Sequence, residues 1–97
     1  MLADEPADTF LHYSLAMELE KEGQHDRSLA EYQALMSATP PYVPAFFMSA
    51  QQLARLGRTA EAQSVLRTGI AQARASGDPH AAGEMSEFLA SLAALGE

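Results

Sequence analysis

A pattern that returns after 34 residues constrains this 97-residue chain more than any other feature of its sequence. Gly23 returns as Gly57, and several residues around each glycine also match in size and type. The matching pairs are Ala16 with Ala50, Leu19 with Leu53, Ser28 with Ala62, Tyr32 with Leu66, and Met36 with Ile70. A two-helix unit of this period is typical of a solenoid, in which each unit covers an apolar face of its neighbour.

Helix breakers divide the chain into stretches of helical periodicity. The breakers are Pro6, Gly23, Pro40–Pro41, Gly57 and Gly77–Pro79. Between them, apolar residues recur every three or four positions, which predicts helices. Because Asp78 is a good cap and Pro79 suits a first helical turn, a helix is expected over 79–95. The chain is therefore predicted to be all-α, with about five helices.

The length fits one small domain over residues 1–97. Within it, the periodicity predicts a first repeat over 7–40 and a second over 41–74. Residues 78–95 are expected to form a C-terminal capping helix, because a solenoid needs a last element with one solvated face. The predicted core positions of the two repeats are Leu15, Ala16, Leu19, Ala50 and Leu53.

Composition argues against several classes of partner. Six basic and thirteen acidic side chains give a net charge of −7, and the basic ones are scattered. Such an acidic chain is not expected to bind nucleic acid or a membrane. The absence of cysteine excludes disulfides and thiolate metal sites. The acidic amino end has no pattern of a secretion signal, so a cytoplasmic location is expected.

The sequence offers no constellation of residues for catalysis. His12, His25 and His80 share no metal-ligand spacing, and we interpret His12 as a helix-packing residue and the other two as turn residues. No serine lies in a nucleophile elbow, and no glycine-rich phosphate loop follows a strand. We therefore expect no catalytic residue, no metal and no cofactor, and the chain is predicted not to be an enzyme.

At this point the chain resembles the tetratricopeptide repeat family, as a small domain of bacterial type. The first unit supplies Leu15, Ala16, Leu19, Gly23, Tyr32 and Pro40 of the family pattern. The second supplies Phe46, Ala50, Leu53, Gly57, Ala62, Leu66 and Gly69. The departures are His12, Ser28, Leu35 and Arg74. The resemblance covers about residues 7–95 and implies an α-solenoid of two helix-turn-helix repeats with a capping helix.

In that family, the first helices of the units line an inner face that holds a peptide or a partner helix. The resemblance therefore implies a scaffold or adaptor for a protein or peptide partner. The predicted partner-binding residues on this face are Phe10, Tyr13, Met17, Lys21, Phe47, Met48, Gln51 and Arg55. The aromatic and methionine side chains would form an apolar groove, since exposed residues of these types mark adaptable interfaces. Lys21, Gln51 and Arg55 would form its polar rim.

Alternatives stay open for these residues. The five apolar side chains would otherwise fill the gap between adjacent first helices. Lys21 and Arg55 would either meet an acidic ligand end or be solvated residues at helix ends. Tyr13 and Met17 stand where the family's carboxylate clamp has Lys and Asn, so that clamp is not predicted. The uncapped first helix predicts a weak homodimer, and the alternative function is structural assembly through homo-oligomerisation.

Overall fold

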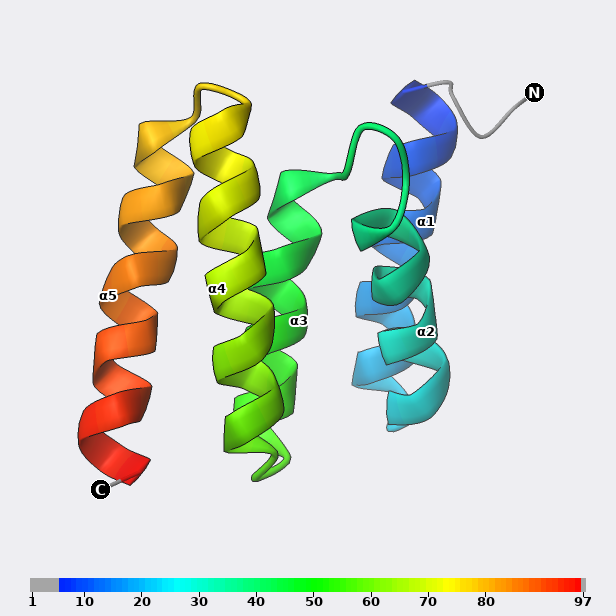
Figure 1. The fold of residues 1–97 in the computed structure, drawn as a ribbon. Coiled ribbons are helices and arrows are strands. Elements are labelled where there is room, and N and C mark those ends of the chain that lie inside the picture. The colour runs from blue at the N-terminus through cyan, green and yellow to red at the C-terminus, as the bar shows by residue number, and fades with distance from the viewer. Residues whose placement is uncertain (1–5, 97) are drawn as a thin grey trace. The chain divides into compact units, whose positions relative to one another are not determined.

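The computed structural model describes residues 6–96, which form five α-helices and no strand. The helices are α1 (Pro6–Lys21), α2 (His25–Met36), α3 (Val43–Arg55), α4 (Thr59–Ala75) and α5 (Pro79–Gly96) (Figure 1). The all-α prediction is thereby confirmed. Residues 1–5 and 97 of the predicted domain lie outside the described residues. Its division into repeats over 7–40 and 41–74 and a cap over 78–95 stays a prediction.

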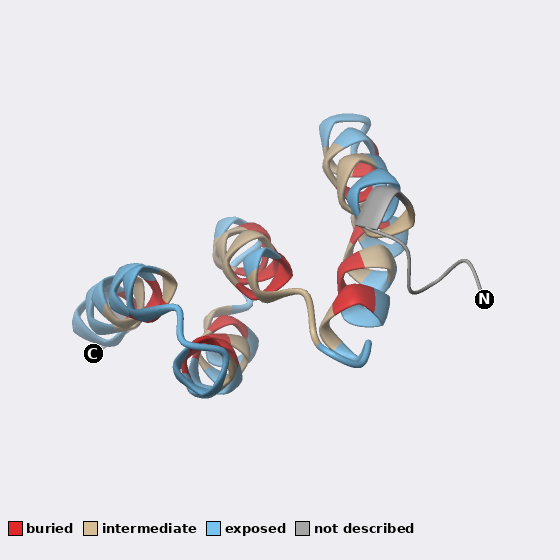
Figure 2. Cartoon of the chain, turned by 90° about the horizontal axis from the view of Figure 1, so that it is seen from above, coloured by how far each residue is buried: buried red, intermediate tan, exposed pale blue. Residues whose placement is uncertain are grey.

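Contacts between residues divide the chain into two compact units, Met1–Ala45 and Phe46–Glu97. The first unit contains the antiparallel pair α1 and α2. The second contains most of α3, followed by the antiparallel pair α4 and α5. Buried residues lie along one side of each helix, as helical periodicity predicts (Figure 2).

Two glycines 34 positions apart close α1 and α3 with the same backbone geometry. Gly23 has a φ of 79° and Gly57 a φ of 81°, in the left-handed region that favours glycine. The amide of the following residue, Gln24 or Arg58, donates to a leucine carbonyl five positions earlier, at 2.9 Å in both turns. This is the Schellman arrangement that ends a helix and satisfies its last carbonyls.

The core of the first unit forms where small residues allow α1 and α2 to approach. Ala16 and Tyr32 are fully buried, and Leu19 is nearly so. The buried Ser28 hydroxyl of α2 donates to the Ala16 carbonyl of α1 at 2.6 Å. The prediction that Leu15 belongs to this core is wrong, because its side chain is 42% exposed. One residue along a helix is a rotation of about 100°, which carries Leu15 away from the side that Ala16 buries.

In the second unit, α3, α4 and α5 meet closely at Gly69. A β-carbon added to Gly69 would lie 2.6 Å from the Phe46 Cβ of α3 and 2.7 Å from the Met85 Sδ of α5. The helices therefore cross so closely at this position that there is no room for a side chain, and glycine fits because it has none. The predicted core residues Ala50 and Leu53 are both buried in this unit.

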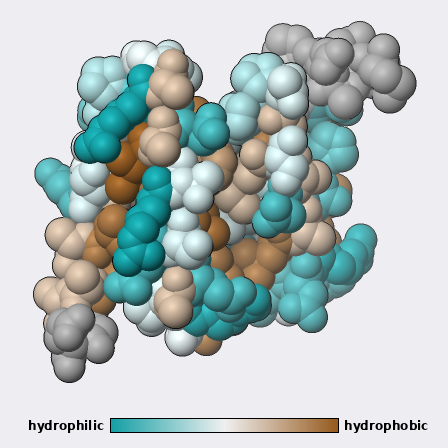
Figure 3. Space-filling model, in the orientation of Figure 1, coloured by the Kyte–Doolittle hydropathy of each residue, from teal (hydrophilic) through white to brown (hydrophobic). Residues whose placement is uncertain are grey.

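Helix α5 begins at the predicted cap. The Asp78 carboxylate accepts a hydrogen bond from the Ala81 amide at 3.1 Å, and Pro79 follows as the first helical residue. On the visible face of α4 and α5, hydrophilic side chains interrupt the hydrophobic ones (Figure 3). That face is therefore a mixed surface rather than a continuous apolar one.

None of the helices between residues 6 and 96 combines the length and the apolar character needed to cross a lipid bilayer.

Candidate functional site

One face of α3 aligns three of the predicted partner-binding residues. Phe47, Gln51 and Arg55 are spaced by four positions, so their side chains follow one another along the helix. Phe47 is half-buried, and its ring meets Phe88 of α5 edge-on, with centroids 5.8 Å apart and planes at 67°. Edge-to-face contacts of this kind are favourable for aromatic rings. The aromatic pair joins α3 to α5 and leaves the later part of both helices to form a groove.

The α3–α5 groove has a volume of about 510 Å³. Its lining residues are Gln51, Ala54 and Arg55 of α3, Thr59 of α4, and Phe88, Leu92 and Leu95 of α5. The α5 wall is entirely apolar, and its three side chains recur at positions i, i+4 and i+7 of the helix. Leu92 is buried, whereas Leu95 is 84% exposed at the mouth of the groove. The groove can therefore receive an apolar side chain from outside.

Arg55, at the end of α3, is the charged side chain among the residues that line the groove. The neighbouring Arg58 donates to Glu61 through two of its guanidinium nitrogens, Nε and Nη2, with the Nη2–Oε2 contact at 3.0 Å. The Arg58 hydrogen bond holds the pKa of the Glu61 carboxyl below its usual value. The Arg58 charge is therefore compensated locally by Glu61.

The structure distributes the eight predicted residues between the two units. Gln51 and Arg55 line the groove, and Phe47 adjoins it through Phe88. Met48 is half-buried on α3 and does not line the groove. The remaining four, which lie on α1, are Phe10, Tyr13, Met17 and Lys21. That all eight share one binding surface stays a prediction.

The α1 residues differ in exposure. Phe10 is 61% exposed, Lys21 is also exposed, and Met17 is half-buried. Tyr13 makes edge-on ring contacts with Tyr32 at 6.1 Å and with Tyr42 at 5.3 Å. Burial, together with Tyr42, raises the pKa of the Tyr13 phenol. Part of the Tyr13 ring is thus engaged inside the first unit, and Phe10 offers the more accessible aromatic surface.

The sequence interpretation does not name the groove residues contributed by α5. Phe88, Leu92 and Leu95 belong to an apolar stripe that the periodicity predicts for this helix. The stripe, however, serves two purposes, since Met85 is buried in the core, Phe88 and Leu95 face the groove, and Leu92 is buried and also lines the groove. The sequence therefore indicates that these positions are apolar. Only the packing of α5 against α4 decides which of them are buried in the core and which line the groove.

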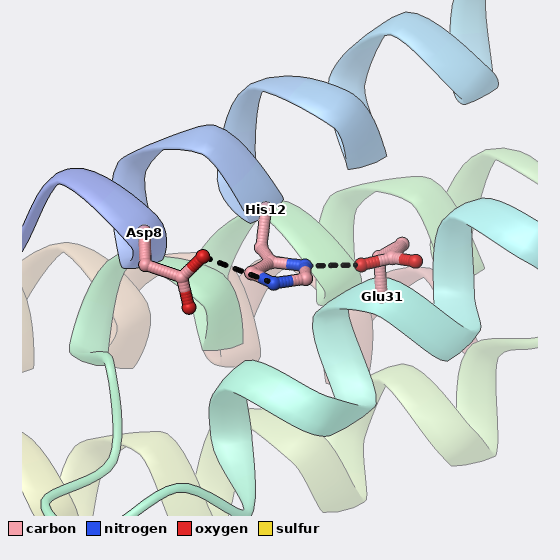
Figure 4. Close-up of polar contacts among 3 residues, drawn as sticks. All are labelled: Asp8, His12 and Glu31. Atoms are coloured by element: carbon pink, nitrogen blue, oxygen red, sulfur yellow. Dashed lines mark hydrogen bonds and ion pairs between the residues drawn. The ribbon is translucent and has the colours of Figure 1, made fainter. Parts of the chain in front are cut away.

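A polar cluster links α1 to α2 in the first unit. His12 lies between Asp8, one turn earlier on α1, and Glu31 of α2 (Figure 4). Its Nδ1 is 2.9 Å from a Glu31 carboxylate oxygen, and its Nε2 is 3.7 Å from an Asp8 oxygen. The hydrogen bond to Glu31, aided by both negative charges, raises the pKa of His12. The expected packing role of His12 is wrong, because the side chain is 46% exposed and makes polar contacts.

This polar cluster is not a metal centre. Within the described part of the chain, no group of three His, Cys, Asp or Glu side chains is arranged to hold a metal ion. A histidine between two carboxylates gains hydrogen bonds when it is protonated, so its contribution here is to join two helices.

Comparisons with known proteins bear on this fold. No protein-family model matches the chain, and no curated protein matches its sequence. The chain is similar to a tetratricopeptide repeat domain protein from Salinibacter ruber, whose structure was solved by NMR in solution. The two share 29% sequence identity and a TM-score of 0.82, over 92% of this chain and 90% of the other.

This chain is a tetratricopeptide-repeat-like domain. The predicted resemblance and the predicted class of helical repeats are both confirmed by that similarity. In the tetratricopeptide-repeat-like domain, α1 and α3 are the first helices of the two predicted repeats. Helix α5 is the next helix after the second predicted repeat. The α3–α5 groove therefore lies between α3, a first helix that the resemblance assigns to the binding face, and α5, the predicted capping helix.

Proposed function

We propose that the tetratricopeptide-repeat-like domain is a non-enzymatic interaction module that binds an apolar peptide or partner helix in the α3–α5 groove. The observation that carries this proposal is the apolar wall of the groove, which ends in a leucine with 84% of its surface exposed. Burying Leu95 against a partner would remove that apolar surface from water. Repeat folds commonly use such surfaces between successive helices for binding.

The groove suits an amphipathic helix or a short apolar segment. The apolar α5 wall would anchor an apolar side chain of the partner. Gln51 and Arg55 on α3 would form a polar rim for the partner's backbone or polar atoms. Phe47 would support this site by holding the Phe88 ring in place. That Phe10, Tyr13, Met17, Lys21 and Met48 also bind a partner, as the resemblance implies, stays a prediction.

A second candidate function is structural assembly through homo-oligomerisation. It is favoured by exposed apolar side chains on α1, where Phe10 is 61% exposed and Leu11 is 64% exposed. Apolar side chains gathered on one helix surface are typical of sites that a partner covers. The two functions are compatible if the groove is the surface to which another copy binds.

The test of the proposed function is a selection of displayed peptides against the dilute domain. Leu95→Asp places a charge at the mouth of the groove, and Leu11→Asp places the same charge on an exposed leucine of α1. Selected peptides should bind Leu95→Asp at least about tenfold more weakly than wild type, because an apolar anchor is lost. They should bind Leu11→Asp with unchanged affinity. Equal binding to the wild type and to Leu95→Asp, or failure to select any peptide, would refute the proposal.

A further inference from the structure

Two exposed arginines on α4 form no ion pair within residues 6–96. Arg67 and Arg74 are seven positions apart, which is close to two helical turns, so their side chains leave the same face of α4. No salt bridge or hydrogen bond of their side chains occurs in this part of the chain. The carboxylate one turn after Arg74, that of Asp78, accepts from the Ala81 amide at the start of α5. We call this face of α4 the arginine stripe, with the exposed residues Ala60, Ser64, Arg67, Ala71 and Arg74.

One face of α1 carries two leucines followed by two carboxylates. Leu11 is 64% exposed and Leu15 is 42% exposed. Glu18 and Glu22 are also exposed, and neither pairs with a cation among the described residues. The Glu22 amide donates to the Glu18 carbonyl, so the helical turn continues to Glu22. We call these four residues the leucine–glutamate stripe.

The two stripes match in spacing and in size. The leucine–glutamate stripe has positions i, i+4, i+7 and i+11, and the first four residues of the arginine stripe have the same intervals. If two such helices lie parallel in this register, Leu11 faces Ala60 and Leu15 faces Ser64. Side chains as small as those of alanine and serine let two helices approach closely, so the leucines can be buried between them.

The charges of the two stripes are opposite in the same register. Glu18 then lies beside Arg67, and Glu22 lies between Arg67 and Arg74. In an antiparallel arrangement with Glu18 beside Arg67, Leu11 would instead meet Arg74. The parallel arrangement is therefore the one that matches both the apolar and the charged halves of the two stripes.

The distribution of charge along the chain favours a second copy as the partner. Residues 1–45 contain eight acidic and two basic side chains, whereas residues 46–97 contain five acidic and four basic ones. The acidic excess thus lies in the first unit, and Arg67 and Arg74 lie in the second. Two copies can meet with opposite charges in contact, whereas two α1 helices placed face to face would bring glutamates together.

We propose that the leucine–glutamate stripe of one copy binds the arginine stripe of a second copy, with the two helices parallel. This inference rests on the second candidate function, assembly of copies, and leaves the α3–α5 groove free for a peptide. The two stripes are different surfaces, so each copy in a pair keeps one stripe for a further copy. The domain should therefore form assemblies that grow with concentration and weaken as salt screens the charges.

Charge reversal on each stripe tests the contact. The arginine variant carries Arg67→Glu and Arg74→Glu, and the glutamate variant carries Glu18→Arg and Glu22→Arg. Each variant alone should self-associate at least about tenfold more weakly than the wild type in analytical ultracentrifugation, because like charges then meet. An equal mixture should associate as the wild type does, since every contact between the two variants joins opposite charges. Circular dichroism checks that each variant is folded.

A matched control separates the contact from an effect of net charge. Lys21→Glu with Arg27→Glu changes the net charge as the arginine variant does, but at exposed positions of the first unit. This control should still self-associate, because both stripes are intact. An equal loss in the control and in the arginine variant would overturn the inference, since net charge alone would then explain the loss.

Two leucine variants distinguish this inference from peptide binding in the groove. Leu11→Asp should lose self-association and keep the selected peptides, whereas Leu95→Asp should lose the peptides and keep self-association. The inference is overturned by a wild type that stays monomeric throughout a concentration series at low salt. It is also overturned if Leu95→Asp loses self-association and Leu11→Asp keeps it, because the contact would then lie in the groove. A monomeric domain that still binds selected peptides keeps the peptide-binding function and loses only the second copy as its partner.

Discussion

The buried hydroxyl of Ser28 on α2 donates a 2.6 Å hydrogen bond to the backbone carbonyl of Ala16 on α1. Both residues are completely buried, so the bond lies at the centre of the first unit. The matching position of the second predicted repeat is Ala62, which has no hydroxyl and is also completely buried. The two positions therefore fit side chains of similar size, and the hydroxyl adds a polar link between the helices.

Ser28→Ala removes that link without creating a clash. We expect it to lower the free energy of unfolding by about 1 kcal/mol, the usual net contribution of one hydrogen bond. Urea denaturation followed by circular dichroism measures the change. Ser64→Ala, at an exposed position of α4, is the control and should leave the urea midpoint nearly unchanged. A neutral result for Ser28→Ala would mean that the Ala16 carbonyl gains nothing from the hydroxyl.

Gly69→Ala should destabilise the second unit. The new β-carbon would meet the Phe46 Cβ at 2.6 Å, and an atom so close to the backbone cannot move away easily. Overpacking of this kind costs about 1–3 kcal/mol. Gly83→Ala is the matched control, because nothing lies within 4 Å of the added carbon. That variant should be more stable by about 0.5–1 kcal/mol, since alanine favours a helix. Thermal melts of the two variants should move in opposite directions.

The His12 cluster makes the link between α1 and α2 depend on pH. The folded-state pKa of His12 is raised, chiefly by its hydrogen bond to Glu31. The stabilisation is therefore complete below the unfolded pKa of about 6.5 and is lost as the pH rises through the higher folded pKa. Because the side chain is 46% exposed, water screens the contact and the effect should be under about 1 kcal/mol.

Urea titrations from mildly acidic to mildly alkaline pH measure this effect in the wild type and in His12→Gln. The wild type should lose more stability than the variant as the pH rises. His80→Gln is the control, since His80 is 85% exposed and its ion pair is with Glu84 of the same helix. Parallel pH profiles of the wild type and His12→Gln would contradict the prediction.

Asp78→Ala should weaken the start of α5. The substitution leaves the Ala81 amide without its carboxylate acceptor, which costs about 1 kcal/mol for a typical cap. Asp78→Ser should recover most of the loss, because a serine hydroxyl can accept the same bond. The comparison is made by thermal melting against Glu87→Ala in the middle of the helix. Equal losses for Asp78→Ala and Asp78→Ser would show that the side-chain acceptor is not what matters.

The helices could be predicted from the sequence because their ends are encoded locally. Gly23 and Gly57 act through their own backbone conformation, and the Asp78 carboxylate accepts from an amide three residues later. Such signals do not depend on which helix packs against which. The fold class followed from them, and the 34-residue spacing added the order of the units.

The side chains that build the groove were harder to predict, because exposure depends on neighbours. Leu15 has the spacing of a core residue on α1, yet 42% of it is exposed. Leu95 continues the apolar stripe of α5, yet it ends at the mouth of a groove. Periodicity gives the direction in which a side chain points, whereas burial also requires another helix to be present on that side.

The left-handed turn at Gly57 limits substitution through chirality rather than through lack of room. No atom lies within 4 Å of the position that an added β-carbon would take, but an L-residue is strained at a φ of 81°. A residue of D configuration prefers positive φ for the same steric reason that an L-residue avoids it. A semisynthetic chain with D-alanine at position 57 should therefore keep this bend, and its unfolded state should have less conformational entropy than that of the glycine chain. L-alanine at the same position should strain the native state.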